Sequence, residues 1–445
     1  MNIIGISEGF HDAGLTLLVG SKIIFASHSE RYSRIKGDRW IHPDMWPRTQ
    51  RYQPDVVAYY EKPFLKNTRR LYAGQKWQKP RVKYDVSFNH HQSHAAAGYY
   101  TSSFDECNVL VVDAIGEWDT VSIWEGKDDK LTKVKSWKYP YSLGLLYSAI
   151  TQRIGLKPNE DEYITMGMAA FGAPSYDLEP LLWENNHRGV FGVWKGASEF
   201  DLAASVQALY ERKFLELVDM CPHKNLIIMG GCALNCVANS KIQGKNIWIM
   251  PSPGDAGSSL GAAALVRKKK LQWKGPYIGY PILNGIPVKK VVDELEKNKV
   301  CGVANGKAEF GPRALGNRSL LADPRWDIKD TVNDIKRRQR FRPFAPAILD
   351  EFADEYFEGP MNEYMQFVAK AKHDYKSVTH VDGTARVQVV KKDCGSLLRQ
   401  ILEDWYDRTG CPLLLNTSLN IKGEPIVNTW EQAEEWSRKY SVAVF

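Results

Sequence analysis

The chain has 445 residues, of which 44% are hydrophobic and 25% charged, and this length predicts two or three globular domains rather than one core. Its net charge of +7 permits an anionic partner, such as a nucleic acid or a nucleotide, but requires neither. Seven cysteines are scattered along the chain without a C-x-x-C pair, which predicts reduced thiols and excludes a disulfide frame. The sequence has no signal peptide and no apolar stretch long enough to cross a bilayer, so we expect a soluble, cytoplasmic protein rather than a membrane-spanning one.

The N-terminal region predicts a strand over residues 2–7, a polar glycine turn over residues 8–14 and further strands over residues 15–19 and 22–26. From periodicity alone this is a β-meander, although folds of the sugar-kinase and actin type begin with the same strand, turn and strand. The turn contains His11. A histidine there is either a general base that works near neutral pH or a turn-stabilising hydrogen-bond partner, and the pattern fits both roles.

Two charged regions follow. Residues 30–36 are strongly charged and predict a solvated surface. Farther along, basic residues alternate with Tyr72 and Trp77: they are Lys66, Arg69, Arg70, Lys76, Lys79, Arg81 and Lys83. Basic residues interleaved with aromatic ones are typical of proteins that follow a nucleic-acid backbone and stack an exposed base, but they would also balance the charge of a bound nucleotide.

Three histidines fall within five residues, just before an alanine-rich run that favours a helix. If this helix begins near Asn89, with Asn89 as its cap, His90 and His94 stand at positions i and i+4 and project from one face. Two imidazoles at this spacing suit one metal ion, although a pair of hydrogen-bonded histidines also fits. His91 points about 100° away and is not expected to be a ligand.

Two aspartates strengthen the metal interpretation. Asp113 follows the apolar run 109–112, and Asp255 follows the apolar run 247–250 after a glycine turn. The first pattern predicts a buried strand with Asp113 at its C-terminal end, where open α/β sheets place their ligands. The second repeats it as an apolar strand, a glycine turn and an exposed aspartate, Asp255. With His90 and His94 these carboxylates would form a mixed nitrogen and oxygen site, suited to iron(II) first and to manganese or zinc as alternatives.

Two glycine-rich loops in the same half of the chain favour a nucleotide site. A predicted strand over residues 225–229 runs into Gly230 and Gly231 and then reaches Asn235, and the second loop contains Gly254 and Gly257. A strand that meets glycines and then a helix presents backbone N–H groups to a phosphate or to adenosine.

The character of the sequence changes beyond a basic segment that predicts a domain boundary near residue 275. Residues 307–319 and 333–346 concentrate arginine among glycine and proline, which suits bidentate recognition of phosphate. A nucleic-acid patch or plain solvated charge competes with this interpretation for Arg337 and Arg338 more than for Arg313, Arg318 and Arg342. Near the C-terminus, an apolar strand over residues 413–415 ends in the amide of Asn416 and the hydroxyl of Ser418, another ligand-facing strand end.

A series of segments, in order, resembles the family of O-carbamoyltransferases that modify antibiotics and nodulation factors. They are residues 10–13, 30–36, 90–94, 113–118, 141–147, 230–235, 253–257, 309–325 and 416–420. The resemblance implies an α/β fold with two domains. Residues 1–275 would form a two-lobed actin/sugar-kinase-like domain (a duplicated RNase H-like fold) for carbamoyl transfer, and residues 276–445 a YrdC-like α/β domain that forms carbamoyl-adenylate.

The resemblance also implies a reaction in two steps. Carbamoyl phosphate and ATP would give carbamoyl-adenylate, and the carbamoyl group would then pass to an acceptor hydroxyl, with a divalent metal as cofactor and ATP with Mg²⁺ as co-substrate. The implied catalytic residues are His11, Asp12, Lys307, Arg313 and Arg318. The implied substrate-binding residues are Lys336, Arg340, Arg342, Asn416, Ser418, Gly230, Gly231, Asn235, Gly254 and Gly257, and the implied metal ligands are His90, His94, Asp113 and Asp255.

The chain departs from this family at Thr165, where the family has a lysine before a Met-Gly pair, and 445 residues is short for the family, which predicts an open acceptor pocket. The acceptor hydroxyl belongs either to a small molecule (a sugar, a natural product or a nucleotide) or to a hydroxymethylated DNA base. A homodimer is compatible with these features, and a membrane partner is not expected. The alternative to an enzyme is a catalytically idle relative that binds nucleotide or nucleic acid as a regulatory module.

Overall fold

The computed structural model describes residues 1–46, 52–192, 194–283, 285 and 288–445, and it divides into two compact units. The first unit comprises Met1–Ser29 and Gly37–Trp273, and the second comprises Glu30–Lys36 and Lys274–Phe445. A single boundary near residue 275 would leave the short segment Glu30–Lys36 in the first part of the chain. In the structure this segment groups with the second unit. The chain passes between the units after Ser29, after Lys36 and after Trp273.

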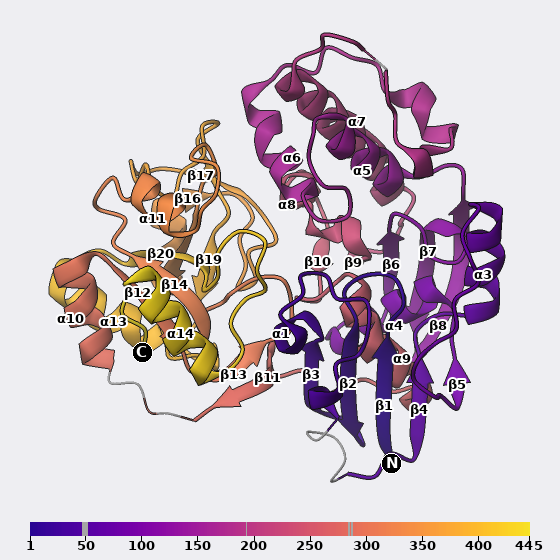
Figure 1. Cartoon of the computed structure of the whole chain (residues 1–445), viewed down its shortest axis with the longest axis horizontal. Coiled ribbons are helices and arrows are strands. Elements are labelled where there is room, and N and C mark those ends of the chain that lie inside the picture. Colours follow the sequence, from indigo (N-terminus) through magenta and orange to yellow (C-terminus); the bar gives the residue numbers. More distant parts are fainter. Residues whose placement is uncertain (47–51, 193, 284, 286–287) are drawn as a thin grey trace. The chain divides into compact units, whose positions relative to one another are not determined.

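The first sheet of the first unit has five strands in the order β3-β2-β1-β4-β5 (Figure 1). They are β1 (Asn2–Ser7), β2 (Gly14–Val19), β3 (Lys22–His28), β4 (Val56–Tyr59) and β5 (Val86–Ser87). β1, β2 and β3 form an antiparallel meander, and β4 and β5 add in parallel. The three strands predicted at the N-terminus are confirmed.

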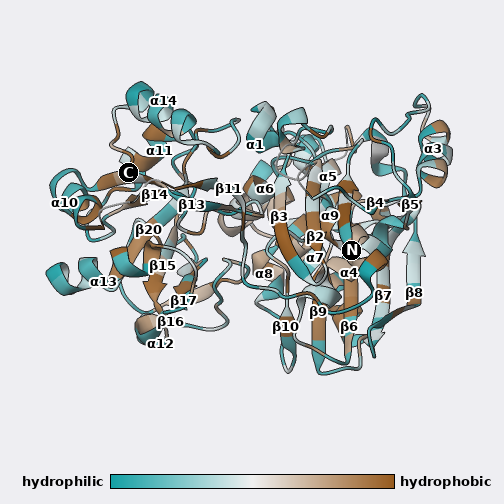
Figure 2. Cartoon of the chain, turned by 90° about the horizontal axis from the view of Figure 1, so that it is seen from below, coloured by the Kyte–Doolittle hydropathy of each residue, from teal (hydrophilic) through white to brown (hydrophobic). Residues whose placement is uncertain are grey.

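A second sheet of the first unit repeats this arrangement in the order β8-β7-β6-β9-β10. Its strands are β6 (Cys107–Val112), β7 (Asp119–Lys127), β8 (Lys130–Lys138), β9 (Asn225–Met229) and β10 (Asn246–Trp248). Again the first three strands form an antiparallel meander, and the last two add in parallel. The same strand order and directions in two sheets confirm the duplicated RNase H-like arrangement. Figure 2 shows β6, which is buried throughout, mainly brown, and the lysine-rich edge strand β8 pale to teal.

Two helices of the first unit, α4 (His90–Thr101) and α9 (Asp255–Arg267), pack against each other. Glycine permits their close approach, because a Cβ at Gly261 in α9 would lie 1.8 Å from the carbonyl oxygen of Ser93 in α4. A Cβ at Gly5 in β1 would lie equally close, 1.8 Å, to the carbonyl oxygen of Ser259 in α9. Both helices are therefore tightly packed, and each begins with a residue of the candidate site.

The remaining helices of the first unit connect the strands, and Figure 1 shows α5 to α8 grouped beside the second sheet. The α-helices are α3 (Pro63–Tyr72), α5 (Leu143–Arg153), α6 (Glu162–Met168), α7 (Glu199–Asp219) and α8 (Cys236–Asn239). The short 3-10 helices are η1 (Pro43–Met45), η2 (Ala169–Phe171), η3 (Glu179–Trp183), η4 (Asn186–Arg188) and η5 (Gly231–Leu234).

The second unit is built on a mixed five-stranded sheet in the order β12-β14-β20-β15-β19. Its strands are β12 (Val300–Ala304), β14 (Arg318–Ala322), β15 (Ala345–Leu349), β19 (Gln388–Val390) and β20 (Leu413–Ser418). Two smaller sheets contain β11 (Tyr277–Ile282) with β13 (Gly306–Glu309), and β16 (Phe357–Glu358), β17 (Ala369–Ala371) and β18 (Thr384–Ala385). The helices are α1 (Glu30–Ser33), α10 (Val288–Asn298), α11 (Lys329–Ile335), η6 (Asp350–Phe352), α12 (Ala353–Tyr356), α13 (Leu398–Thr409) and α14 (Trp430–Tyr440).

One hydrophobic core joins the main sheet of the second unit to its helices, and Trp405 of α13 is fully buried in it. Sheets covered by helices make both units α/β, as the sequence predicted. The relation of the second unit to YrdC proteins stays a prediction. Among the described helices, none combines the length and the apolar character that crossing a membrane requires.

Candidate metal centre and phosphate-binding loops

Helix α4 begins at His90, as predicted, but its cap differs from the expected one. Asn89 occupies the N-cap position and makes no capping hydrogen bond with its side chain. The carboxylate of Glu117 accepts the backbone N–H of His90 instead, at 2.9 and 3.2 Å, and it also accepts the N–H of Lys62 at 2.8 Å. A carboxylate at a helix N-terminus is electrostatically favourable, so Glu117 fixes the start of the helix. The sequence did not predict Glu117 as the cap, and its only indication was the position of this carboxylate shortly after Asp113.

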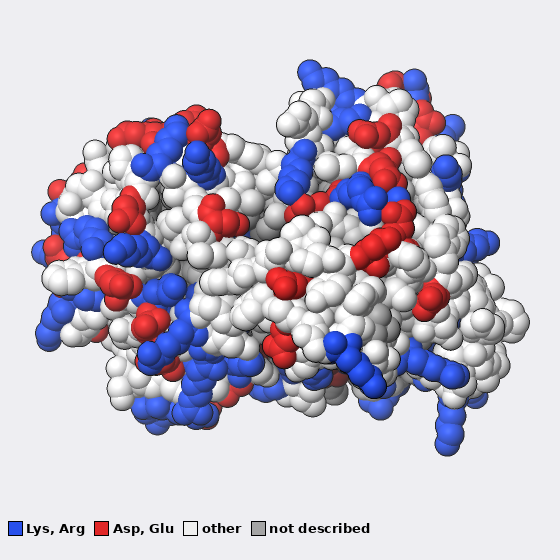
Figure 3. All heavy atoms as spheres, turned by 90° about the horizontal axis from the view of Figure 1, so that it is seen from above, with Lys and Arg blue, Asp and Glu red and all other residues white. Residues whose placement is uncertain are grey.

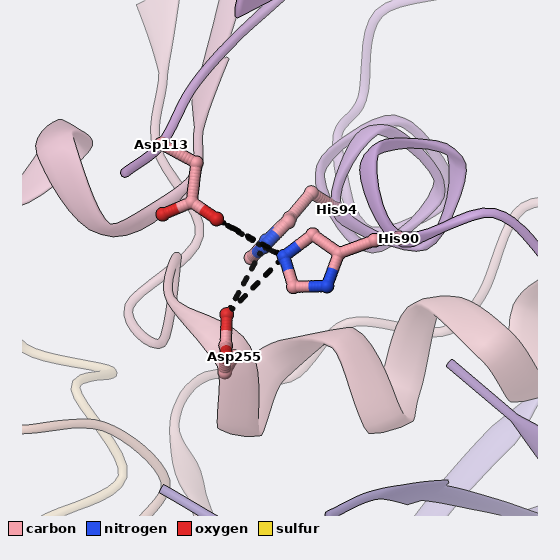
Figure 4. Close-up of side chains that lie close together, drawn as sticks. All are labelled: His90, His94, Asp113 and Asp255. Carbon is pink, nitrogen blue, oxygen red and sulfur yellow. Dashed lines mark hydrogen bonds and ion pairs between the residues drawn. The ribbon is translucent and has the colours of Figure 1, made fainter. Parts of the chain in front are cut away.

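Four side chains predicted as metal ligands point toward one another (Figure 4): His90 and His94 from α4, Asp113 after β6, and Asp255 at the start of α9. His90 Nε2 lies 3.0 Å from Asp113 Oδ2 and 3.0 Å from His94 Nε2. Each of the two Nε2 atoms lies 3.4 Å from Asp255 Oδ1. One ligand atom from each residue lies within 4.8 Å of all the others, a spacing that fits a single ion.

Hydrogen bonds orient these imidazoles. His94 Nδ1 lies 3.0 Å from the carbonyl oxygen of Pro253. Because a carbonyl oxygen only accepts, Nδ1 carries a proton, and this hydrogen bond leaves Nε2 as the nitrogen that faces the cluster. His90 Nδ1 faces Glu61 Oε2 at 3.9 Å. His91 hydrogen-bonds Ser122 Oγ at 2.8 Å and lies outside the four-residue cluster, as expected.

The cluster is buried and contains two carboxylates. The expectation of an exposed Asp255 is wrong, because Asp255 begins α9 and is only 4% exposed. Burial alone would raise the pKa of Asp113, but the hydrogen bond with His90 holds that pKa well below its usual range. Burial also acts to raise the pKa of Asp255, but the charges of His90 and His11 and the hydrogen bonds with His90 and His94 together lower it well below its usual range. Buried carboxylates need a compensating positive charge. A metal ion would supply it, and two imidazoles with two carboxylates suit iron(II), manganese(II) or zinc(II).

His11 and Asp12 lie in the turn between β1 and β2, where His11 Nδ1 is 2.9 Å from Asp12 Oδ2. Their side chains remain 30% and 39% exposed. Burial acts to lower the pKa of His11, but the charge of Asp255 and the hydrogen bond with Asp12 raise it to about 9. The charge of Asp113 contributes in the same direction. The charges of both cluster carboxylates therefore act on the imidazole of His11.

The two glycine loops support the cluster directly. Gly230 has a φ of +92°, and a Cβ there would lie 2.2 Å from the carbonyl oxygen of Val112, so the position requires glycine. The N–H of Gly231 donates to Asp113 Oδ1 at 3.3 Å. Gly254 is the N-cap residue of α9, directly before Asp255, and a Cβ at Gly257 would lie 1.8 Å from the carbonyl oxygen of Ser252. These contacts explain the glycines through the placement of both aspartates, and a role in nucleotide binding stays a prediction.

Asn235 and Thr165 both make internal contacts. Asn235 Oδ1 accepts the N–H of Ala238 at 3.0 Å, and its Nδ2 donates to Gln207 Oε1 at 2.9 Å. Thr165 is buried, with its Oγ1 2.9 Å from Thr151 Oγ1. The side chain that replaces the family's lysine therefore packs between helices, and the amide of Asn235 caps α8.

The basic residues predicted to bind phosphate in the second unit differ in exposure. Lys307 is exposed, and Arg313 and Arg342 are partly exposed. Arg340 is exposed and pairs with Asp334 at 3.0 Å and with Asp330 at 3.8 Å. An exposed pair of this kind contributes little to stability and holds the guanidinium only loosely.

Lys336 follows the last residue of α11 and is buried, and its side chain reaches Ser418 at the end of β20. Its Nζ donates to the carbonyl oxygen of Ser418 and, at 3.0 Å each, to the carbonyl and side-chain oxygens of Asn420. Burial, together with nearby Arg338 and Arg342, lowers the pKa of Lys336 well below its usual value. Asn416 Nδ2 donates to Gln388 Oε1 at 2.6 Å, while Asn416 Oδ1 is buried and accepts no hydrogen bond from the described residues.

Arg318 is placed differently from an exposed phosphate ligand. It is 0% exposed, and burial lowers its pKa to about 10. All three guanidinium nitrogens donate to backbone carbonyl oxygens, which belong to Asn428 (3.1 Å), Asn305 (2.7 Å), Asn317 (2.8 Å) and Tyr280 (2.8 Å). The guanidinium therefore ties loops of the second unit together, an arrangement that favours a structural role over phosphate binding.

Two charged regions predicted at the surface are partly buried. Lys66 and Arg69 are only 5% and 6% exposed, and Lys66 Nζ lies 2.5 Å from Glu61 Oε1. Neither side chain is therefore available to follow a nucleic-acid backbone. Arg31 is 2% exposed, so the expectation of a solvated surface over residues 30–36 is wrong for this residue. In both regions tertiary packing overrides what charge alone predicts.

Two family models match: carbamoyltransferase N-terminus over residues 46–190 and 184–264, and carbamoyltransferase C-terminus over residues 292–445. An uncharacterized protein of Synechocystis sp. is 32% identical, over 97% of this chain and 93% of that protein. Nodulation protein NolNO of Sinorhizobium fredii is 30% identical, over 94% of this chain and 75% of that protein.

Solved structures with a similar fold cover 60% of this chain. They include full-length HypF in its phosphate- and nucleotide-bound form, with a TM-score of 0.38, 16% identity and 46% of that chain covered. A ROK family glucokinase from Streptomyces griseus gives a TM-score of 0.32, 11% identity and 99% coverage of that chain.

Both family models and the similarity to nodulation protein NolNO agree with the resemblance drawn from the motifs. The chain belongs to the carbamoyltransferase family, and it is an enzyme of that class.

Proposed function

We propose that the chain is an ATP-dependent O-carbamoyltransferase that works in two steps. In the first step, carbamoyl phosphate is hydrolysed to carbamate and phosphate. A carbamate oxygen then attacks the α-phosphorus of ATP, and pyrophosphate leaves. In the second step, an acceptor hydroxyl oxygen attacks the carbamoyl carbon, and the bond to the AMP phosphate breaks. The observation that carries the proposal is the buried cluster of two histidines and two aspartates in a chain of the carbamoyltransferase family.

The second unit offers groups suited to the first step. Lys307, Arg313 and Arg342 are exposed or partly exposed cations and would bind the phosphates of carbamoyl phosphate and of ATP with its Mg²⁺. Asn416 Oδ1 is a buried acceptor without a donor among the described residues, so the N–H of a carbamoyl group would satisfy it. Ser418 lies on the same strand end.

The first unit offers groups suited to the second step. A divalent metal held by His90, His94, Asp113 and Asp255 would supply positive charge for the adenylate phosphate. Asp12 orients the imidazole of His11. In its neutral form this imidazole would accept the proton of the acceptor hydroxyl. The backbone N–H groups of the loops at Gly231 and Gly254 would face the nucleotide.

A pyrophosphate-release assay tests the proposal. Purified protein with ATP, Mg²⁺ and carbamoyl phosphate should release pyrophosphate, and omission of carbamoyl phosphate should stop the release. Folded protein that releases none under these conditions would contradict the adenylate route and would favour the idle regulatory relative. Mass spectrometry of candidate acceptors, with a carbamoyl mass gain as readout, then identifies the acceptor.

We infer a small hydroxyl compound as the acceptor, in keeping with a partly exposed His11. A hydroxymethylated DNA base is the second candidate. It is favoured by the basic residues that stay outside the core near the exposed Trp77, which are Arg70, Lys76, Lys79, Arg81 and Lys83.

A further inference from the structure

The segment Glu30–Lys36, here called the strap, belongs to the second unit although the chain on both sides of it belongs to the first. Arg34 anchors it there with two hydrogen bonds. Its Nη1 donates to the carbonyl oxygen of Ile426 and its Nη2 to that of Pro425, both at 2.7 Å. Arg31 adds a third, from Nη2 to the carbonyl oxygen of Gly311 at 3.1 Å.

One anchor lies beside a proposed phosphate-binding group, Arg313, and the other two follow the strand that carries Asn416 and Ser418. Gly311 stands between Lys307 and Arg313, and Pro425 follows the strand end at Ser418. Stability alone does not account for the strap. Arg34 has a φ of +60°, which is costly for a residue with a side chain, and Arg31 is buried with Nε and Nη1 unpaired among the described residues.

The residues at both ends of the strap hold the turn that contains His11. The N–H of Ser29 donates to the carbonyl oxygen of Ala13 at 2.7 Å. After the strap, Asp38 and Arg39 accept the N–H groups of Ala13 and Gly9, both at 2.7 Å, and Gly37 accepts that of Asp12 at 3.4 Å. All of these bonds lie within the first unit.

We propose that Arg34 is a positioning residue: by anchoring the strap in the second unit, it holds the His11 turn of the first unit in its working conformation. Only Ile35 and Lys36 separate Arg34 from Gly37, so the anchored residue and the residues that hold the turn are joined by a short covalent link. A change in the loops at Gly311 and Pro425 is therefore transmitted through the covalent chain to His11. The link between the two half-reactions rests on the proposed function, whereas the mechanical link does not.

Hydrogen exchange on the full-length protein tests the mechanical link without any substrate. In Arg34→Ala, the amides of Gly9 and Ala13 should exchange at least about tenfold faster, because the pairing that protects them is loosened. Arg408→Ala is the matched control, since it breaks surface ion pairs of the second unit with Asp293 and Asp404 and leaves the strap intact. Protection at Gly9 and Ala13 should stay unchanged in this control.

Unchanged protection in Arg34→Ala, or an equal loss in Arg408→Ala, would overturn the proposal. If Arg34→Ala does not fold, Arg34→Gln, which keeps one donor group, is measured in its place with the same criteria. The activity readout compares the half-reactions: transfer from pre-formed carbamoyl-adenylate should fall at least about tenfold in Arg34→Ala, and pyrophosphate release should change less. Loss of protection in a protein whose wild type makes no carbamoyl-adenylate would support the mechanical link and reject the proposed function.

Discussion

At the scale of single residues, neighbours rather than burial alone determine which way each side chain of the cluster points. The carbonyl group of Pro253 sets the proton of His94 on Nδ1, and the N–H of Gly231 steadies Asp113. His91, one residue from a predicted ligand, turns to Ser122 instead. Because His91 shares the helix and the burial of His90, it offers a control for metal binding.

We expect the double substitution His90→Ala and His94→Ala to remove bound metal almost completely, because it leaves only two carboxylates at the site. Elemental analysis of the purified proteins measures this. His91→Gln, the matched control, should retain the metal content of the wild type. Equal metal content in the double variant and the wild type would place the metal elsewhere.

Substitution of Arg318 and of Arg313 should distinguish an arginine with a structural role from one that binds phosphate. Arg318→Ala leaves several buried carbonyl groups without a donor and should lower the free energy of unfolding by about 3 kcal/mol or more. Arg313→Ala, at a partly exposed position, should unfold at nearly the wild-type denaturant concentration and lose pyrophosphate release. Urea unfolding and the release assay measure the two effects, and the reverse pattern would make Arg318 the phosphate ligand.

Metal binding should change the titration of His11. Without metal, the carboxylate of Asp255 helps to raise the pKa of His11 to about 9. A divalent cation bound at Asp255 neutralises this charge and repels the imidazolium, so Zn²⁺ should lower the pKa by at least about one unit. Transfer that needs neutral His11 should accordingly rise with pH until the metal-bound pKa is passed. NMR titration with His11→Gln for assignment measures both pKa values, and a pKa that Zn²⁺ leaves unchanged would contradict this placement of the metal.

At the scale of elements, the start of α4 depends on a carboxylate from another segment. Glu117→Ala removes the acceptor of the His90 and Lys62 N–H groups and should lower the free energy of unfolding by about 1–2 kcal/mol. It should also weaken Zn²⁺ binding, because His90 is the first residue of the helix. Glu117→Gln keeps one acceptor oxygen and should lose less unfolding free energy and less Zn²⁺ affinity than Glu117→Ala. Urea unfolding and calorimetric titration measure the effects, and a Glu117→Ala protein with wild-type values for both would show that the cap is dispensable.

Sequence patterns predicted β1, β2, β3, β6 and β9, the start of α4 and the meeting of four ligands, because strand ends and an i, i+4 pair are local signals. The cap of α4 could not be predicted in this way. Asn89 is a good capping residue by type, but the tertiary fold brings Glu117 closer to the vacant N–H groups. Arg31 likewise bonds a partner distant in the sequence, Gly311. Lys66 pairs with the nearby Glu61, but both side chains are buried by tertiary packing, which composition does not encode.

At the scale of the whole molecule, the net charge of +7 is not gathered on the face shown in Figure 3, where positive and negative side chains are interspersed. With Lys66 and Arg69 buried, the basic residues left in that segment are Arg70, Lys76, Lys79, Arg81 and Lys83. Each phosphate contact adds about −0.9 to the slope of log affinity against log salt, so contacts by all of them would give a slope of about −4.5.

We expect a hydroxymethylated oligonucleotide to bind weakly, with a slope shallower than about −2, and to be carbamoylated no faster than the free nucleoside. Fluorescence anisotropy at several salt concentrations and mass spectrometry measure the two quantities. Lys79→Glu with Lys83→Glu should then weaken binding no more than the matched exposed pair Lys268→Glu with Lys269→Glu. A steep slope that only the Lys79 and Lys83 variant reduces, together with faster modification of the oligonucleotide, would make the DNA base the acceptor. A basic segment whose first lysine, Lys66, is turned inward to Glu61 gives a nucleic-acid backbone less to follow, and this favours the small hydroxyl compound.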